Sequence, residues 1–425
     1  MPKNLDAVDR RHAPGRGLWL LGPAMVAGVA YLDPGNVASN MTAGASFGYL
    51  LVWVVVLGNV MAWLIQYLSA KLGIVTGESL PQVLGRRIGR PWARRAYWLQ
   101  AELVAMATDI AEVIGGAVAL NLLFGVPLVW GGAITGVVSM LLLVVQSRRG
   151  ARAFETVLIG LLVIIAVGFT FGLFFAPPAA GSVVAGLVPR FEGTNSVLLA
   201  ASILGATIMP HAIYAHSALT RDRFAPGTPA TAAGLEEARG ISTPRLLRAT
   251  RWDVTIALAV AGTVNLAILL LAAANLAGVD GTDSLEGAYA ALRNGLGPLV
   301  ATLFAVGLLA SGLASTSVGA YAGAEIMHGL LHVRVPLLAR RLVTLLPALA
   351  ILAVGIDPTL ALVLSQVVLS FGIPFALVPL IALTANRDLL GAHRNRRLTS
   401  VAGIAASVFL ITLNAVLLWL VFTGG

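Results

Sequence analysis

The chain has 425 residues, of which 58% are hydrophobic and only 11% are charged. So few charged side chains cannot cover the surface of a water-soluble protein, which places the chain in a membrane. The formal net charge is +9, and the sequence contains no cysteine, which excludes disulfide bonds and thiolate metal sites.

Long apolar stretches recur along the chain, and no linker between them is long enough to separate two domains. Most reach the ~20 residues that an α-helix needs to cross a bilayer, so we predict an all-α membrane protein with a single transmembrane domain over residues 1–425. The eleven stretches are 18–40, 50–72, 98–123, 130–145, 157–175, 197–219, 254–274, 299–327, 342–354, 360–383 and 401–422. The ninth is short, and it spans only if residues 339–341 extend it while the charges of Arg340 and Arg341 snorkel to the interface.

Basic residues predict how the chain is oriented. Residues 1–17 carry basic side chains but no apolar core, which argues against a cleaved signal peptide and favours a cytoplasmic N-terminal segment. Further basic clusters then fall on the same side, at 86–95, 148–152, 221–251, 334–341 and 387–397. Of the 28 Lys and Arg residues, only Arg190 and Arg293 lie outside. The positive-inside rule therefore predicts a cytoplasmic N-terminus and an outer C-terminus.

This topology also accounts for the positive net charge. Because the charge follows the loops, no nucleic-acid partner is expected, whereas the basic loops can contact anionic lipid head groups of the bilayer. We expect a multi-pass protein of a bacterial-type inner (cell) membrane, with the C-terminus on the extracellular or periplasmic side. No obligatory protein partner is evident.

Two of the predicted spans contain a helix-breaking sequence near mid-membrane. The first has Asp-Pro-Gly-Asn at 33–36, and the sixth has Met-Pro-His at 209–211. Proline removes a backbone donor and clashes with the preceding turn, and Gly35 is free to take a positive φ, so each helix should be interrupted. Freed carbonyl groups at that depth can coordinate a cation. Paired broken helices five spans apart are typical of inverted-repeat transporters, although Pro210 alone is compatible with an ordinary proline kink.

The residues beside these breaks form a candidate cation site. A carboxylate at the centre of a span costs roughly 2.5–3.5 kcal/mol on insertion scales and is therefore functional by default. Asp33 would supply an anionic oxygen, Asn36 an amide oxygen and Met209 a thioether, with the carbonyl groups of Ala30 and Ala206 completing the set. Because Mg²⁺ and Ca²⁺ prefer oxygen ligands only, the thioether favours manganese, iron, cobalt or cadmium. The alternative is that Met209 is a packing residue of the core.

A second polar feature lies in the third span. Glu102, Asp109 and Glu112 are spaced by seven and three residues, which places all three carboxylates on one helical face. A lipid-facing stripe of acids is untenable, so this face must point into the bundle, where its carboxylates can hold and release protons. Arg340 and Arg341 at the inner end of the ninth span are natural partners. The alternative is a structural salt-bridge network that joins the third span to the ninth.

Polar residues elsewhere in the spans give weaker signals. His211 and His216 lie five residues apart in the sixth span and do not share a face. Each is compatible either with a hydrogen-bonded structural group or with a proton-linked gate, because histidine titrates near physiological pH. Gln66 and Asn265 are expected to line an outer vestibule.

The two break sequences together, within eleven spans, resemble the Nramp family of metal-ion transporters over essentially the whole chain. The resemblance implies a LeuT-like fold with a five-plus-five inverted repeat (18–175 and 197–383) and a final helix at 401–422. It implies proton-coupled symport of divalent metals such as Mn²⁺ and Fe²⁺, and also Cd²⁺ and Co²⁺, into the cytoplasm, with no prosthetic group.

The same resemblance assigns roles to individual residues. It places the metal ligands on Asp33, Asn36, Met209 and the carbonyl groups of Ala30 and Ala206, and it adds Gln366 of the tenth span in some conformations. It also implies a proton route that runs from the aspartate of the metal site to the cytoplasm. The candidate residues of that route are Asp33, Asp109, Glu112, Glu102, Arg340, Arg341, His211 and His216.

Two other classes of function are alternatives to a proton-coupled metal transporter. A sodium-coupled amino-acid symporter would share the broken helices, and Asp33 with freed carbonyl groups could hold sodium, but Met209 argues against it. An intramembrane metalloenzyme would need a motif such as His-Glu-x-x-His, which the sequence lacks. We therefore expect a transporter and not an enzyme.

Overall fold

Helices occupy each of the predicted apolar stretches in the computed structural model. The structure describes residues 22–225, 232–333 and 336–423, and no strand occurs among them. Within its helices, the side chains of residues 143–155, 232–233, 317 and 337 are not described. The predicted cytoplasmic segment 1–17, residues 18–21 of the first stretch, Arg334 and the basic side chains of 148–152 therefore lie outside the described part.

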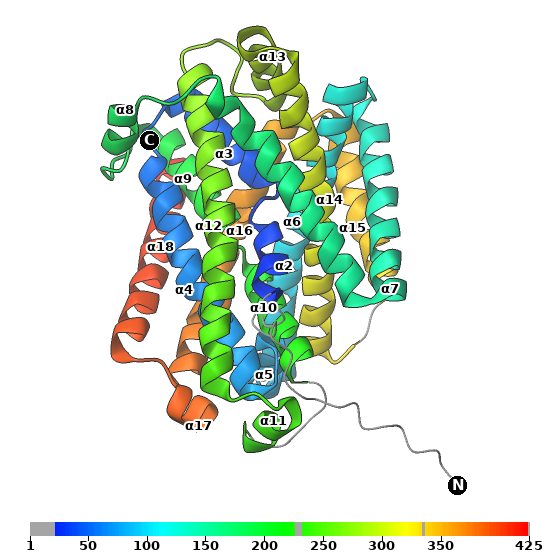
Figure 1. Cartoon of the computed structure of the whole chain (residues 1–425), viewed down its shortest axis with the longest axis vertical. Coiled ribbons are helices and arrows are strands. Elements are labelled where there is room, and N and C mark those ends of the chain that lie inside the picture. The colour runs from blue at the N-terminus through cyan, green and yellow to red at the C-terminus, as the bar shows by residue number, and fades with distance from the viewer. Residues whose placement is uncertain (1–21, 226–231, 334–335, 424–425) are drawn as a thin grey trace.

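Both helices with a breaking sequence are divided in two, as predicted. The first stretch forms α2 (Pro23–Ala30) and α3 (Pro34–Phe47), and the sixth forms α9 (Gly193–Thr207) and α10 (Pro210–Phe224). In Figure 1, α2, α3 and α10 lie along the middle of the molecule. In the most apolar part of α9–α10, 94% of the residues are buried, compared with 33% in the last helix, and most residues of α2 and α3 are buried as well, so the broken helices form the centre of the bundle.

Longer helices surround this centre. α12 packs on α3, α16 on α9, and α14 on α6. In Figure 1, α18 lies at the left edge, and α15 lies on the right side beside α7. The long helices are α4 (Val52–Thr76), α6 (Pro91–Phe124), α7 (Leu128–Thr170), α12 (Thr243–Asn275), α14 (Pro298–Leu331), α15 (Leu337–Val354), α16 (Pro358–Ala385) and α18 (Arg397–Thr423).

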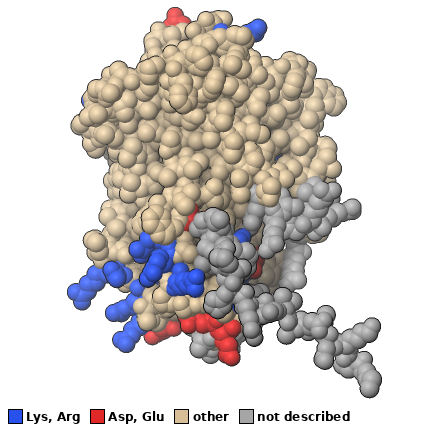
Figure 2. Space-filling model, in the orientation of Figure 1, with Lys and Arg blue, Asp and Glu red and all other residues tan. Residues whose placement is uncertain are grey.

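Short helices cap the two ends of the bundle and were not predicted. They are α5 (Leu80–Arg87), α8 (Ala180–Ala185), α11 (Ala232–Arg239), α13 (Leu285–Leu296) and α17 (Arg387–Leu390), with 3₁₀ turns at η1 (Phe171–Phe174) and η2 (Gly391–His393). The sequence carries a signal for α5, because Ser79 and Gln82 form a reciprocal capping box. In Figure 2, Lys and Arg gather at the lower end, where Figure 1 places α11 and α17.

The fourth and fifth stretches differ most from the prediction. They form one helical segment, α7, of 43 residues without an intervening loop. A straight helix of this length would measure about 65 Å, more than twice the ~30 Å hydrocarbon core. The ribbon of α7 accordingly bends back near the lower right of Figure 1, so that its two arms run in opposite directions.

The count of eleven spans remains a prediction. Within the described residues, eight helices are long and apolar enough to cross a membrane. The first, fourth and ninth stretches are not among them. The first is divided into α2, of 8 residues, and α3, of 14 residues, and the fourth appears only as a shorter apolar helix, Leu128–Leu142. The sixth is counted as one segment, Gly193–Phe224, across its break.

Candidate functional site

The break between α2 and α3 follows from local chemistry. Asp33 occupies the N-cap position of α3 with an extended backbone, and its Oδ1 accepts a hydrogen bond from Asn36 N at 2.8 Å. Pro34 fills the first helical position, where a missing N–H costs nothing. A new helix therefore begins at residue 34 within the span, and the fully buried carboxylate of Asp33 lies at its N-terminus.

The break between α9 and α10 also has a proline at the start of its second helix, but a different residue stands in the N-cap position. Met209 stands in the N-cap position of α10, and Pro210 fills the first helical position. The Met209 side chain is fully buried, and it makes no capping hydrogen bond. Its thioether is therefore not used to begin the helix.

Asn36 joins the two breaks directly. Its Nδ2 donates to the carbonyl oxygen of Tyr31 at 2.7 Å and to that of Ala206 at 2.8 Å. Its Oδ1 accepts from Asn40 Nδ2 at 3.2 Å, one helical turn further along α3. One buried side chain thus bridges unwound backbone of the first span to the end of α9.

Gln366 of α16 lies against both broken helices. Its Nε2 donates to Asp33 Oδ2 at 3.0 Å, whereas its Oε1 has no hydrogen-bond partner among the described residues. A Cβ atom at Gly35 would lie 1.7 Å from Gln366 Nε2, and one at Gly205 would lie 1.9 Å from the Gln366 carbonyl oxygen. The expectation of a positive φ at Gly35 was wrong, because this glycine is helical and allows a close approach instead.

The structure therefore brings most of the predicted metal ligands together. Asp33, Asn36, Ala206 and Gln366 are linked by hydrogen bonds. Ala30 and Met209 are fully buried at the same two breaks, Ala30 at the end of α2 and Met209 at the start of α10. Carboxylate and carbonyl oxygens each have two lone pairs, so those that already accept one hydrogen bond can still bind a cation.

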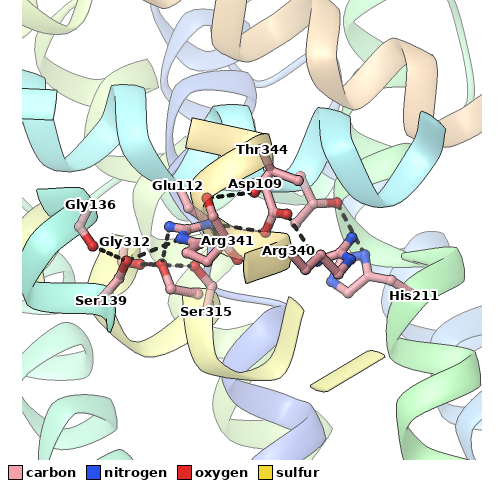
Figure 3. Close-up of polar contacts among 12 residues, drawn as sticks. Asp109, Glu112, Gly136, Ser139, His211, Gly312, Ser315, Arg340, Arg341 and Thr344 are labelled. Atoms are coloured by element: carbon pink, nitrogen blue, oxygen red, sulfur yellow. Dashed lines mark hydrogen bonds and ion pairs between the residues drawn. The ribbon is translucent and has the colours of Figure 1, made fainter. Parts of the chain in front are cut away.

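The three carboxylates of α6 face two arginines of α15, and Figure 3 shows Asp109 and Glu112 beside Arg340 and Arg341. Arg340 contacts Glu102 at 3.0 Å and Asp109 at 3.1 Å. Arg341 contacts Asp109 at 2.9 Å and Glu112 at 3.3 Å. All five side chains are buried, so we call this set the α6–α15 ion cluster. The predicted partnership of the two helices is confirmed.

Arg340 and Arg341 extend α15 as predicted, but they do not snorkel. Arg341 is only 1% exposed, and it also donates to Ser139 of α7 and Thr316 of α14. Carboxylates inside the bundle hold these guanidinium groups more strongly than the interface could, because a charge in low dielectric needs a close counter-ion. The predicted interfacial position was therefore wrong.

The α6–α15 ion cluster lies next to the first break. Pro34 packs so closely on α6 that a Cβ atom at Gly115 would lie 2.0 Å from Pro34 Cβ. Glu112 is three residues before Gly115, and Asp33 directly precedes Pro34. The acid of the break and the innermost acid of the cluster are thus held on adjoining surfaces of two packed helices.

The two histidines of α10 occupy different environments. His211 Nδ1 lies 3.2 Å from Thr108 Oγ1 of α6. His216 Nδ1 lies 2.7 Å from Gln66 Oε1, and Gln66 in turn donates to the Tyr31 hydroxyl. Both histidines are buried, and neither Nε2 has a partner among the described residues.

The predicted outer vestibule at Gln66 and Asn265 is not observed. Both side chains are buried, and Asn265 Nδ2 donates to the Tyr31 carbonyl oxygen at 2.9 Å. They belong instead to the hydrogen-bond network around the first break, because Tyr31 offers both a hydroxyl and an unwound carbonyl group.

Sequence analysis missed three residues that the structure places in buried networks. Tyr31 and Asn40 surround the first break. Glu325 of α14 pairs with Arg221 of α10 at 2.5 Å and accepts from Ser79 at 2.7 Å. The signal for Glu325 was present, because an ionisable side chain inside an apolar span is rarely without a partner.

Comparisons with known proteins agree with this architecture. A family model described as natural resistance-associated macrophage protein-like (Nramp) matches residues 24–420. The divalent metal cation transporter MntH of Mycobacterium tuberculosis (strain CDC 1551 / Oshkosh) is 59% identical over 418 residues, which cover 98% of this chain and 95% of that protein. The crystal structure of a manganese transporter from Eremococcus coleocola is 32% identical and superimposes with a TM-score of 0.82, covering 96% of this chain and 88% of that chain.

More distant solved structures show the fold alone. Mhp1, a nucleobase-cation-symport-1 family transporter, gives a TM-score of 0.53 at 16% identity and covers 95% of this chain and 93% of that chain. MhsT gives 0.58 at 13% identity and covers 93% of this chain and 97% of that chain. The predicted all-α, LeuT-like architecture is confirmed by these neighbours. With the family model matching almost the full length, the chain belongs to the Nramp family.

Proposed function

We propose that this chain imports divalent transition-metal ions, chiefly Mn²⁺ and Fe²⁺ with Cd²⁺ and Co²⁺ as further substrates, together with protons. The relatives named above are called divalent metal cation and manganese transporters. The family is one of transporters, and we assign no catalytic residue. The protein lies in the cell membrane as a multi-pass bundle.

The observation that carries the proposal is the environment of Asp33. This buried carboxylate accepts hydrogen bonds from the backbone N–H groups of Asn36 and Gly35 and from Gln366 Nε2, none of which carries a positive charge that would neutralise it. A buried anion without a counter-ion is costly. A metal cation from outside would supply the missing charge, and the oxygen atoms around it are already gathered there.

The remaining ligands decide which cation is accepted. The amide oxygens of Asn36 and Gln366 and the carbonyl groups of Ala30 and Ala206 suit any divalent cation. Met209 adds a thioether, which hard Mg²⁺ and Ca²⁺ do not prefer. Asn36 must rotate to offer its oxygen, which would break its hydrogen bonds to Tyr31 and Ala206.

Uptake into proteoliposomes that contain a pH-sensitive dye tests substrate and coupling together. Manganese should enter without sodium, the lumen should acidify with it, and amino acids should not compete. Sodium-dependent uptake that amino acids inhibit would instead support the symporter alternative.

The α6–α15 ion cluster is proposed as the onward route for the proton. It holds three carboxylates and two guanidinium groups, so it is neutral when one carboxyl group is protonated. Because an uncompensated buried charge is costly, the cluster is suited to receive one proton that enters together with the metal ion. We propose that His211 and His216 of α10 tune this transfer, which is supported by their contacts with Thr108 of α6 and with Gln66.

Asp109→Asn tests the proton route, because it keeps the shape of the side chain and removes one titratable group. Metal-driven proton uptake should fall several-fold and lose its pH dependence, while metal binding measured by calorimetry should persist. Asp388→Asn on exposed α17 is the matched control. An unchanged proton flux in Asp109→Asn would return the cluster to a structural role.

We also propose the predicted topology, with a cytoplasmic N-terminus, repeats at 18–175 and 197–383, and a final helix at 401–422. The absence of cysteine makes the test direct, because any introduced thiol is the only one present. In sealed vesicles of known orientation, Arg293→Cys should react with an impermeant maleimide only from the outer side, and Arg396→Cys only from the cytoplasmic side. The opposite pattern would invert the topology.

A further inference from the structure

An apolar groove lies on the side of the bundle, and its lining includes no residue of the two helix breaks or of the α6–α15 ion cluster. Residues of α4, the segment 187–191 and α18 line this open groove, which has a volume of about 590 Å³. This volume falls within the ~300–1,000 Å³ typical of small-molecule sites. α8 and the upper ends of α4 and α18 meet at the upper left of Figure 1.

The floor of the groove is a stripe along α4. Trp53, Val56, Leu57 and Val60 line it, with the spacing that places side chains on one helical face. The stripe runs for about 10 Å along the helix axis. Its lower end is open to the outside of the bundle, because Val60 is 60% exposed. The groove is therefore elongated and lies parallel to a membrane-spanning helix.

The outer end of the groove is held in place by hydrogen bonds and ring contacts. Trp53 N donates to the Gly186 carbonyl oxygen at 3.0 Å, and Trp53 Nε1 donates to that of Arg190 at 3.3 Å. The indole ring packs edge-on against Phe191 at 5.4 Å and Phe409 of α18 at 6.5 Å between centroids. The outer end of the groove is therefore fixed by specific contacts between α4, the segment 186–191 and α18.

Arg190 gives the groove its single charge. It is one of only two basic residues that the sequence assigns to the outer side. Its side chain is 54% exposed, and the ion pair with the still more exposed Glu192 is long, at 4.0 Å. Such surface pairs contribute little. The planar guanidinium group therefore remains available for an oxyanion, and phosphate matches its geometry.

We propose that this groove binds a phospholipid of the outer leaflet, with one acyl chain along α4 and an anionic head group against Arg190. Lipid is the occupant because the groove is elongated, apolar along its length, open towards the bilayer and charged only at its outer end. Acyl chains already lie in hydrocarbon, so the preference among lipids must come from the head group. The bound lipid would fill the space between α4 and α18.

Native mass spectrometry of the protein with equal amounts of phosphatidylglycerol and phosphatidylcholine, matched in acyl chains, tests this proposal. The wild-type protein should retain phosphatidylglycerol preferentially. Arg190→Gln should lower the ratio of the two adducts roughly fivefold, equivalent to the about 1 kcal/mol that one basic residue contributes near an anionic surface. Val56→Phe, which fills the groove, should reduce both adducts.

Two matched controls should change neither quantity. Arg293→Gln removes the other outer basic residue, and Val137→Phe enlarges an exposed valine of α7 outside the groove. An unchanged ratio in Arg190→Gln, or unchanged adducts in both Val56→Phe and Val60→Phe, would overturn the proposal. The proposal would also be overturned if the wild-type protein formed a dimer and Val56→Phe dissociated it. The occupant of the groove would then be a second copy of the chain.

Discussion

The break between α2 and α3 and the α6–α15 ion cluster both bury carboxylates, but only the cluster supplies them with cations. Asp33 is held by uncharged donors, which are backbone N–H groups and the amide group of Gln366. Asp109 is held by two guanidinium groups, at 3.1 and 2.9 Å. The two regions adjoin where Pro34 packs on Gly115.

This difference indicates what each region is suited to do. A carboxylate that lacks a counter-ion gains most from a cation that arrives, so the break is suited to bind and release one. Carboxylates that already have counter-ions hold the helices together, and one proton can neutralise the negative charge that remains when three of them face two guanidinium groups. A substitution should therefore affect transport more than stability at the break, and stability more than metal binding in the cluster.

Asp33→Asn should have the largest effect on transport. It keeps the shape of the side chain but removes the anion, and loss of one partner from a buried charge pair costs about 3–5 kcal/mol. Manganese uptake into proteoliposomes should fall at least ~100-fold. The melting temperature should be unchanged or higher, because the variant no longer buries an unneutralised charge. Near wild-type uptake would show that Asp33 is not the metal ligand.

Arg341→Met should show the reverse pattern. It leaves Asp109 and Glu112 with one counter-ion fewer in a fully buried place, and the cost should be about 3–5 kcal/mol of stability. Thermal unfolding in detergent measures it, with exposed Arg387→Met as the control. Adding Asp109→Asn to Arg341→Met should restore part of the loss. If Arg341→Met melts like the parent, the cluster does not join α6 to α15.

Gly205→Ala should have a smaller effect, at the boundary between α9 and α16. The new Cβ atom would lie 1.9 Å from the Gln366 carbonyl oxygen, so α16 must move away from the break. Overpacking of this kind costs about 1–3 kcal/mol. Gly160→Ala has no atom within 4 Å of the new Cβ and should be neutral or slightly stabilising. Equal melting temperatures would mean that α16 tolerates displacement.

Sequence analysis succeeded where the signal was local and costly. A proline in each of two spans and a single aspartate at mid-membrane predicted both breaks. The buried acids of α6 required basic partners, which predicted the arginines of α15. It failed where tertiary contacts decide. Nothing in the sequence tells that Gly35 serves a close approach by Gln366, or that Gln66 and Asn265 turn towards Tyr31. The sequence also did not predict that the connection within α7 is helical, because basic residues between two apolar stretches are equally compatible with a loop.

Met209→Ala should have the smallest effect on uptake and the effect that differs most between metals. It removes the single sulfur atom of the site and leaves every oxygen atom at the breaks in place. The thioether is buried and makes no capping contact, so its loss does not remove the start of α10. Cadmium, the softest substrate, should lose roughly tenfold in affinity, manganese should lose less, and calcium or magnesium should begin to compete. Competition uptake with each metal measures this order, with Met140→Ala on α7 as a packing control. Were the variant to exclude calcium as well as the parent does while its cadmium affinity held, sulfur would not be the filter, and geometry alone would select the metal.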